Sequence, residues 1–155
     1  MDLSALKEAV ATLNADDAFG QRLSEDTWQA LAPLLTRHEL RVGHLLLKQD
    51  EVDATLYFLE RGSLQVFVTC STPGTHRVAI LRAGSVVGEA GLFGRTPRMA
   101  NVEAMSNCVV WGLRAAQLES LAAQAPALAL ELVRAAAGVL AVRTRANLER
   151  AVPLS

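Results

Sequence analysis

One short segment of the sequence gathers the residue types that bind a small anionic ligand. It spans residues 86–102 and contains Gly88, Glu89 and Arg98. Gly88 permits close approach of the backbone to a ligand, and a turn of helix over residues 90–93 would direct N–H groups at an anion. Arg98 offers a planar guanidinium to a phosphate, and Glu89 can accept hydrogen bonds from a sugar hydroxyl. The segment therefore predicts a site for a small anionic nucleotide.

A plainer interpretation of the same two charges is a structural ion pair. Glu89 and Arg98 would then face each other at the edge of the strands, and such exposed pairs are common and weak. For an isolated pair we would favour this interpretation. The order of glycines, acid, proline and arginine in one segment favours the nucleotide site instead.

The rest of the sequence offers no second chemistry. His38, His44 and His76 lack the spacing of metal ligands, so we predict no metal site. Cys70 and Cys108 are too few for a disulfide framework, and we expect Cys108 to be buried and reduced. No nucleophile stands beside a base, so we predict no catalytic residue, no cofactor and no enzyme activity.

The elements around this segment are, in order, helices, strands and helices. Residues 3–13 have apolar positions at helical spacing, and Ser24 followed by two acids is typical of a helix start. From Leu40 the apolar period shortens to two, and turns such as 49–51 and 71–74 separate β-rich runs. These runs are 40–42, 45–47, 55–59, 63–68, 76–81, 100–105 and 108–113. The pattern predicts a mainly β fold with flanking α, an antiparallel, jelly-roll-like β-roll of about eight strands.

Two helices are expected after the strands, because the composition changes to Ala, Leu, Gln, Glu and Arg. The first covers 114–124, and Pro126 opens a longer one that ends near residue 150. This long helix has two apolar stripes: Leu130, Val133, Ala137, Leu140 and Thr144 on one, and Leu132, Ala136 and Val139 on the other. We expect one stripe to pack on the strands and the other to contact a second copy, which gives a homodimer. The alternative is a monomer whose helix folds over its own strands.

Composition limits the partners. The 155 residues are 51% apolar and 20% charged, with a net charge of −1. This is the balance of a globular domain, and it gives no general attraction to nucleic acid or to an anionic membrane. No apolar run reaches the length of a membrane span, and the acidic, amphipathic start is unlike a secretion signal. We expect a cytoplasmic protein that itself binds neither membrane nor nucleic acid, and no helix-turn-helix follows the last helix.

The segment from Gly88 to Ala100 also resembles a known motif. Residues 88–92, followed by Thr96-Pro97 and by Arg98-Met99-Ala100, are similar to the phosphate-binding cassette of cyclic nucleotide-binding domains. That family includes the bacterial catabolite activator protein and the regulatory subunits of cAMP-dependent kinase. The resemblance runs from about residue 19 to 150, and 43–48, 56–62 and 84–89 match the family's strand and glycine signatures.

The resemblance implies a role for each matching residue. Glu89 would bind the ribose 2′-hydroxyl, Arg98 the cyclic phosphate, and the backbone of the cassette the remaining phosphate oxygens. Arg143 and Thr144 match the positions where hydroxyls of the last helix reach adenine in the catabolite activator. The candidate ligand-binding residues are therefore Gly88, Glu89, Ala90, Gly91, Arg98, Met99, Ala100, Arg143 and Thr144.

Several residues depart from the family pattern. Gln49, Asp50 and Asp53 stand where glycines usually form a tight turn, although Asp tolerates left-handed backbone better than most residues. Met99 replaces a small residue, and in members that select cGMP a Thr, so it argues against cGMP. Met99 is also bulky enough to crowd the phosphate. These departures motivate an alternative, a degenerate fold without ligand that serves as a dimerisation or protein-interaction module.

Taken together, residues 1–150 are expected to form one cyclic nucleotide-binding domain. Helices would occupy 1–37, the β-roll 38–113 with its cassette at 87–102, and the C-terminal lid and dimer helices 114–150. The expected function is a sensor in signal transduction or transcription regulation. It would bind cAMP rather than cGMP and couple binding to movement of the C-terminal helices.

Overall fold

The described residues before the first strand include three helical segments. The structure, a computed structural model, describes residues 2–19, 22–69 and 75–151. The segments are α1 (Ser4–Thr12), α2 (Glu25–Leu31) and the short 3-10 helix η2 (Ala32–Leu34). Ser24 caps α2 as predicted, because its side-chain oxygen accepts a hydrogen bond from the Thr27 N–H at 3.3 Å.

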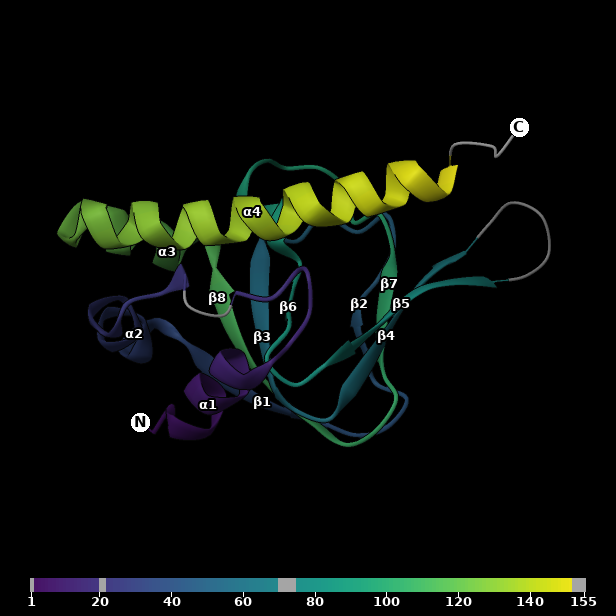
Figure 1. The fold of residues 1–155 in the computed structure, drawn as a ribbon, viewed down its shortest axis with the longest axis horizontal. Coiled ribbons are helices and arrows are strands. Elements are labelled where there is room, and N and C mark those ends of the chain that lie inside the picture. The colour runs from purple at the N-terminus through teal and green to yellow at the C-terminus, as the bar shows by residue number, and fades with distance from the viewer. Residues whose placement is uncertain (1, 20–21, 70–74, 152–155) are drawn as a thin grey trace.

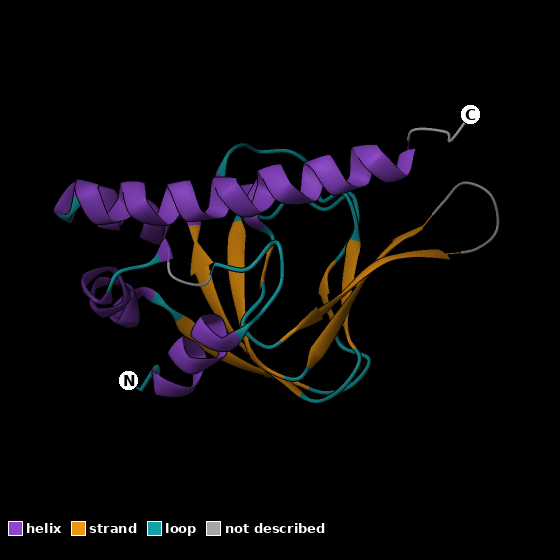
Figure 2. Ribbon diagram, viewed as in Figure 1, coloured by secondary structure: helices purple, strands orange, loops and turns teal. Residues whose placement is uncertain are grey.

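Eight antiparallel strands in the described residues form two four-stranded sheets (Figures 1 and 2). They are β1 (Thr36–Leu40), β2 (Leu45–Leu47), β3 (Thr55–Arg61), β4 (Ser63–Thr69), β5 (Thr75–Arg82), β6 (Val86–Val87), β7 (Asn101–Ala104) and β8 (Cys108–Arg114). One sheet has the order β1-β8-β3-β6 and the other β2-β7-β4-β5. The mainly β fold with flanking helices and the antiparallel β-roll are therefore confirmed. The turn predicted at 71–74 lies outside the described residues, as does Cys70.

The first strand lies earlier than predicted. β1 starts at Thr36, inside the 1–37 region assigned to helices, and ends at Leu40, so the predicted run 40–42 is wrong. Its partner is β8, in a register that joins Thr36 to Gly112 and Leu40 to Cys108. The first four residues of β1 are exposed, so no apolar alternation marks them in the sequence. Pairing with β8, a contact that is distant in sequence, sets where this strand begins.

A second difference is the two-residue strand β6, which lies inside the predicted ligand-binding segment. It pairs with β3, joining Val87 to Tyr57 and Val86 to Phe58. Two residues are too few to show a period of two, so the sequence pattern does not reveal the strand. Because β6 ends directly before Gly88, it fixes the start of the cassette to the sheet.

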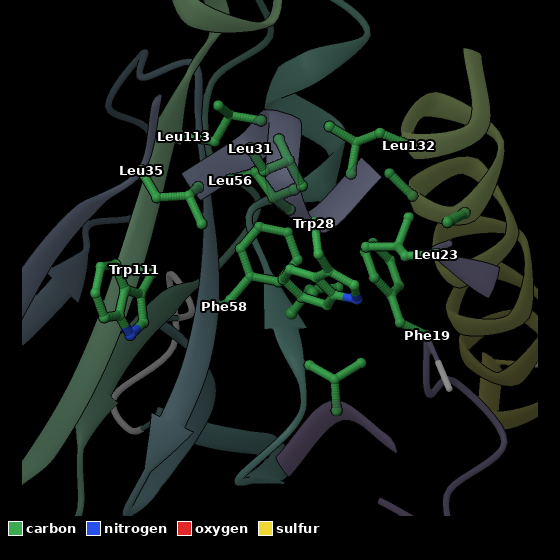
Figure 3. Close-up of a cluster of buried hydrophobic side chains, with 14 of the residues drawn as sticks. Phe19, Leu23, Trp28, Leu31, Leu35, Leu56, Phe58, Trp111, Leu113 and Leu132 are labelled. Carbon is green, nitrogen blue, oxygen red and sulfur yellow. The ribbon is translucent and has the colours of Figure 1, made fainter. Parts of the chain in front are cut away.

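The apolar core has two parts. The larger part lies between the sheet that contains β3 and β8 and the helices, and Figure 3 labels ten of its side chains. They are Phe19, Leu23, Trp28, Leu31, Leu35, Leu56, Phe58, Trp111, Leu113 and Leu132. The smaller part lies inside the roll and includes Leu64, Val102, Cys108 and Val110. Both tryptophans are thus core residues, and Cys108 is a buried free thiol, as predicted.

Two helices follow the strands, close to their expected bounds. They are α3 (Ala115–Gln124) and α4 (Pro126–Ala151), and Pro126 opens α4 as predicted. α4 lies across the top of the roll in Figure 1. Leu132, Ala136 and Val139 are fully buried, so this one of the two predicted stripes of α4 packs on the core. The helix thereby covers the end of the roll where the cassette lies.

Candidate functional site

A cavity of about 480 Å³ lies between the cassette, the sheet that contains β4 and β5, and α4. All nine residues predicted to bind the ligand line it: Gly88, Glu89, Ala90, Gly91, Arg98, Met99, Ala100, Arg143 and Thr144. Apolar side chains from the sheet, including Val66, Val68, Ala79, Leu81 and Val102, form the opposite wall. Residues that are far apart in sequence therefore surround one space that combines an apolar wall with charged groups.

The cassette begins with a glycine that no other residue replaces easily. Gly88 has φ +83°, and a Cβ on it would lie 2.6 Å from the Thr55 carbonyl oxygen and 3.0 Å from Nη1 of Arg98. The 3-10 helix η3 (Glu89–Leu92) follows, close to the predicted turn at 90–93. A Cβ on Gly91 would lie 2.9 Å from the same Arg98 nitrogen. Both glycines leave room for the Arg98 side chain, a reason beyond the expected approach of a ligand.

Arg98 is 7% exposed and is held by carbonyl oxygens. Nη1 donates to the Gly88 oxygen at 3.0 Å and Nη2 to the Thr55 oxygen at 2.8 Å. Nη2 also lies 3.4 Å from the Asp53 carboxylate. In the described residues Nε of Arg98 is the only buried side-chain nitrogen or oxygen without a hydrogen bond. A buried cation with an unused N–H in a cavity wall suits an anion.

The turn at 49–53 holds Arg98 from the other side. The Arg98 N–H donates to the Glu51 oxygen at 2.8 Å, and the Asp50 N–H donates to the Arg98 oxygen at 2.8 Å. Asp50 has φ +72°, the left-handed conformation that we expected it to tolerate. The turn therefore forms without the family's glycines. Nearby, burial raises the pKa of Tyr57 and the Asp53 charge adds to the effect, so this phenol stays neutral at pH 7.

Glu89 does not pair with Arg98, so the ion-pair interpretation of these two charges is wrong. The Glu89 carboxylate is 6% exposed and accepts a hydrogen bond from Nη1 of Arg143, on α4, at 2.9 Å. Nε of Arg143 donates to Asp17 at 2.8 Å and Nη2 to the Val86 oxygen at 2.7 Å. α4 is thus bound to the cassette, to β6 and to the turn before α2.

Met99 and Thr144 lie at the mouth of the cavity. The Met99 side chain is 71% exposed, so its bulk points largely to solvent and not into the space beside Arg98. Thr144 is also exposed and lies on α4. The adjacent Ala100 is half-buried. Crowding by Met99, which the sequence suggested, does not occur in this arrangement.

Sequence reasoning missed several polar residues of the site. Asp17 and Asn147 line the cavity, and Asp53 contacts Arg98 behind the cassette. Asp53 carried a signal, because it replaces a family glycine. Asp17 carried none, since its partner Arg143 is 126 residues away in sequence. No cluster of three or more His, Cys, Asp or Glu side chains that could hold a metal occurs among the described residues.

Comparison with protein-family models identifies the class. Residues 37–125 match the model of the cyclic nucleotide-binding domain. This match covers more than half of the chain, and the chain belongs to that family. Within the described residues, no helix is both long and apolar enough to cross a membrane.

Curated relatives include cyclic-nucleotide-dependent kinases and their subunits. A cAMP-dependent protein kinase regulatory subunit of Blastocladiella emersonii is 30% identical over 93 residues, 60% of this chain and 23% of that protein. A cGMP-dependent protein kinase of Plasmodium berghei is 27% identical over 112 residues, 70% of this chain and 12% of that protein. The chain thus spans about a quarter or less of the length of these relatives.

Solved structures share the whole fold. A cyclic nucleotide-binding domain from Methylobacillus flagellatus superposes with a TM-score of 0.81 at 21% identity, covering 96% of this chain and 81% of that one. The Thermus thermophilus catabolite activator protein gives a TM-score of 0.70 at 24% identity, covering 82% of this chain and 58% of that one. At such identity the likeness establishes the fold, which agrees with the predicted β-roll.

Proposed function

We propose that this domain is a sensor that binds a cyclic mononucleotide, cAMP in preference to cGMP, in the cavity between the cassette and α4. The observation that carries the proposal is Arg98. A buried guanidinium with an unused N–H lines this cavity, and a cyclic phosphate would supply the missing acceptor. The remainder of the site fits the other two parts of a nucleotide.

The sugar would be bound by Glu89. One of its oxygens accepts from Arg143, and the carboxylate lines the cavity, where a ribose hydroxyl can donate to it. The base would lie against the apolar wall formed by β4 and β5 and beside Thr144 of α4. A volume of about 480 Å³ is within the range of small-molecule sites.

The preference for cAMP rests on Met99 and on the relatives. Met99 has no hydroxyl to offer to guanine, and its side chain is largely exposed. The relatives include regulatory subunits of cAMP-dependent kinases from three organisms, beside a cGMP-dependent kinase. We place the protein in the cytoplasm, in signal transduction or transcription regulation, as a binding domain without catalytic residues or a cofactor.

Coupling to the C-terminal helices follows from the walls of the cavity. The cassette forms one side and α4, through Leu140, Arg143 and Thr144, forms another. A ligand that touches both sides binds the closed arrangement more tightly and shifts the population toward it. Of the predicted second stripe of α4, Leu130, Ala137 and Thr144 are exposed, whereas Val133 and Leu140 are half-buried. The exposed residues would contact a second copy of the chain, so we propose a homodimer.

The second candidate, a degenerate module without ligand, is favoured by one specific observation. Both charged groups of the site already have protein partners, since Asp53 lies beside Arg98 and Arg143 binds Glu89. A site neutralised in this way is stable without a nucleotide. It would then act through dimerisation or through a protein partner.

Calorimetric titration with cAMP and cGMP distinguishes the nucleotide sensor from the module without ligand. We expect micromolar or tighter cAMP binding, weaker cGMP binding, and a loss of about 100-fold or more in Arg98→Ala, because charge-assisted hydrogen bonds to phosphate are lost. Arg95→Ala is the matched control, since Arg95 is exposed in the same segment and does not line the cavity. Absence of binding by folded protein would favour the interaction module.

A further inference from the structure

A groove of about 440 Å³ lies along the first half of α4, beside the turn that precedes α2. It is lined by Arg22, Ala127, Leu130, Glu131, Arg134 and Ala135. None of these six residues lines the nucleotide cavity, so the groove is a separate feature of the surface. Leu130 is 50% exposed in it. An exposed apolar side chain in a groove with charged walls is typical of a contact surface.

Two arginines of the groove have no acidic partner. Arg22 and Arg134 are exposed, and neither forms an ion pair with another described residue. The acid of the groove, Glu131, is occupied by the backbone N–H and the hydroxyl of Ser24. Guanidinium groups without carboxylates suit a partner that brings an acid. Together with Leu130, they fit a segment that offers an acidic and an apolar side chain side by side.

The exposed side of α4 offers such a segment, because its residue spacing is the same in both directions. The residues are Leu130, Arg134, Ala137, Ala141, Thr144 and Leu148. Each of them lies as far before residue 139 as another lies after it. When two copies of α4 run antiparallel about this point, Leu130 of one faces Leu148 of the other at both ends. Two alanines from each helix then meet at the centre, where they allow a close approach.

Antiparallel pairing also suits the charges better than parallel pairing. Parallel helices would place Arg134 opposite its own copy, and like charges in an interface oppose association. Antiparallel helices place it opposite Thr144 and bring the last turns of the second helix to the groove. Those turns carry Arg145 and Glu149, which are exposed and pair with each other at 3.2 Å. Glu149 can turn to Arg134, because a long side chain on a helix leans toward the start of that helix.

We propose that α4 pairs with α4 of a second copy in antiparallel orientation, and that Leu148 and Glu149 of each chain occupy the groove around Leu130 and Arg134 of the other. The inference rests on the homodimer proposed above and adds its orientation and its contacts. Thr144 also lines the nucleotide cavity, so Arg134 of the second copy lies at the edge of that cavity. Each nucleotide site is thereby bordered by both chains.

Cysteine cross-linking distinguishes the two orientations. Leu130→Cys and Leu148→Cys are made in separate chains. Both chains carry Cys70→Ser, which leaves the buried Cys108 as the only other thiol. Mild oxidation of the mixed chains should give a disulfide-linked dimer. Neither variant alone should do so, because its two cysteines lie about 27 Å apart along antiparallel helices. Ala123→Cys, at an exposed position on α3, is the control and should not cross-link to Leu130→Cys.

A charge exchange tests the contact between Glu149 and Arg134. Glu149→Arg should weaken the dimer about tenfold, since it adds a cation beside the arginines of the groove. Adding Arg134→Glu should recover most of this loss, because the exchanged charges attract each other again. In a parallel dimer the two positions lie about 22 Å apart along the helices, so the second change would give no recovery. Sedimentation equilibrium measures the dimer Kd of the wild type and of both variants.

Three results would overturn the inference. Cross-linking of Leu148→Cys to itself would show that the helices run parallel. A dimer that gives no mixed cross-link would place the interface on another face of the molecule. A monomeric wild type would remove the homodimer together with this inference. Calorimetry with cAMP is a separate measurement, so absence of nucleotide binding would remove the proposed sensor function and leave the interface between the two helices intact.

Discussion

The Arg98 guanidinium and the Asp53 carboxylate form a pair of unequal exposure. Nη2 of Arg98 lies 3.4 Å from Oδ2 of Asp53, and the arginine side chain is 6% exposed while the aspartate side chain is 39% exposed. The other Asp53 oxygen accepts from the Thr55 hydroxyl at 2.9 Å. A buried cation is therefore balanced by an acid that water still reaches. An anion that enters the cavity meets an arginine already partly neutralised.

Asp53→Asn should strengthen binding of cyclic nucleotides. Asn keeps an oxygen for the Thr55 hydroxyl but removes the negative charge beside Arg98, so the cyclic phosphate no longer competes with Asp53. We expect the Kd for cAMP to fall by about three- to tenfold at low salt and by less at high salt. Titration at two salt concentrations measures both effects.

Glu51→Gln is the control for that change. It removes one charge from the same loop, but the Glu51 side chain is exposed and only its backbone contacts Arg98. Its effect on the Kd should be less than twofold. Weaker binding in Asp53→Asn would show instead that Asp53 orients Arg98 for the phosphate.

Gly91→Ala should disturb the cassette through the Arg98 side chain. A Cβ at this position would lie 2.8 Å from the Asp53 carbonyl oxygen and 2.9 Å from Nη1 of Arg98, and Gly91 is buried. We expect a loss of about 1–3 kcal/mol in the free energy of unfolding and weaker cAMP binding. Gly94→Ala is the control, because no atom lies within 4 Å of a Cβ there. Chemical denaturation of both variants measures the difference, and equal stability would contradict the crowding around Arg98.

Local patterns were sufficient to predict the cassette. Gly88, Glu89 and Arg98 lie within eleven consecutive positions of the sequence, and the turn that presents them is set by nearby glycines and a proline. All of them line one cavity in the structure. The helix cap at Ser24 and the start of α4 at Pro126 were predictable for the same reason, since each depends on a few neighbouring residues.

Contacts between distant segments were not predictable. Asp17 contacts Arg143 across a sequence separation of 126 residues, and the local sequence around either residue does not predict the contact. The start of β1 is set by pairing with β8, and β6 is too short to show a period. The roles of Asp17 and Asp53, and the partner of Glu89, therefore required the three-dimensional arrangement.

The contact between α2 and α4 should depend on pH. Glu131, on α4, accepts from the backbone N–H and the hydroxyl of Ser24, and this backbone hydrogen bond is the main reason why its pKa lies below the ordinary value of 4.5. A carboxylate whose pKa is lower in the folded state stabilises the fold above its unfolded pKa. This stability is lost as pH falls through the folded pKa.

Glu131→Gln should therefore be less stable than the wild type at pH 7, and the difference in stability should be smaller at pH 3. Denaturant unfolding at pH 7 and pH 3 measures the free energy of unfolding of both proteins, and the difference between them should decrease below about pH 4.5. Glu119→Gln on α3 is the control, because its side chain is exposed and makes no hydrogen bond in the described residues. A difference in the free energy of unfolding that stays constant from pH 7 to pH 3 would mean that the packing of the Glu131 side chain, and not its charge, stabilises the contact with Ser24.

The outer face of α4 carries a stripe of exposed residues at alternating spacings of four and three. They are Leu130, Arg134, Ala137, Ala141, Thr144 and Leu148. Leu130 is 50% and Leu148 62% exposed, which is high for leucine on a helix that packs on a core with its other side. The spacing is that of two helices in contact along their length, and the central alanines allow a close approach. Thr144 belongs both to this stripe and to the cavity.

Ala141→Glu should separate the proposed dimer. In an interface between identical helices the two new carboxylates lie near each other and lose water, so their repulsion and desolvation oppose association. Sedimentation of the wild type should give a dimer at micromolar concentration, and Ala141→Glu should be mainly monomeric while its melting remains cooperative. Ala123→Glu introduces the same change at an exposed site on α3 and should stay dimeric. A monomeric wild type, or equal dissociation in both variants, would rule out this face of α4 as the interface.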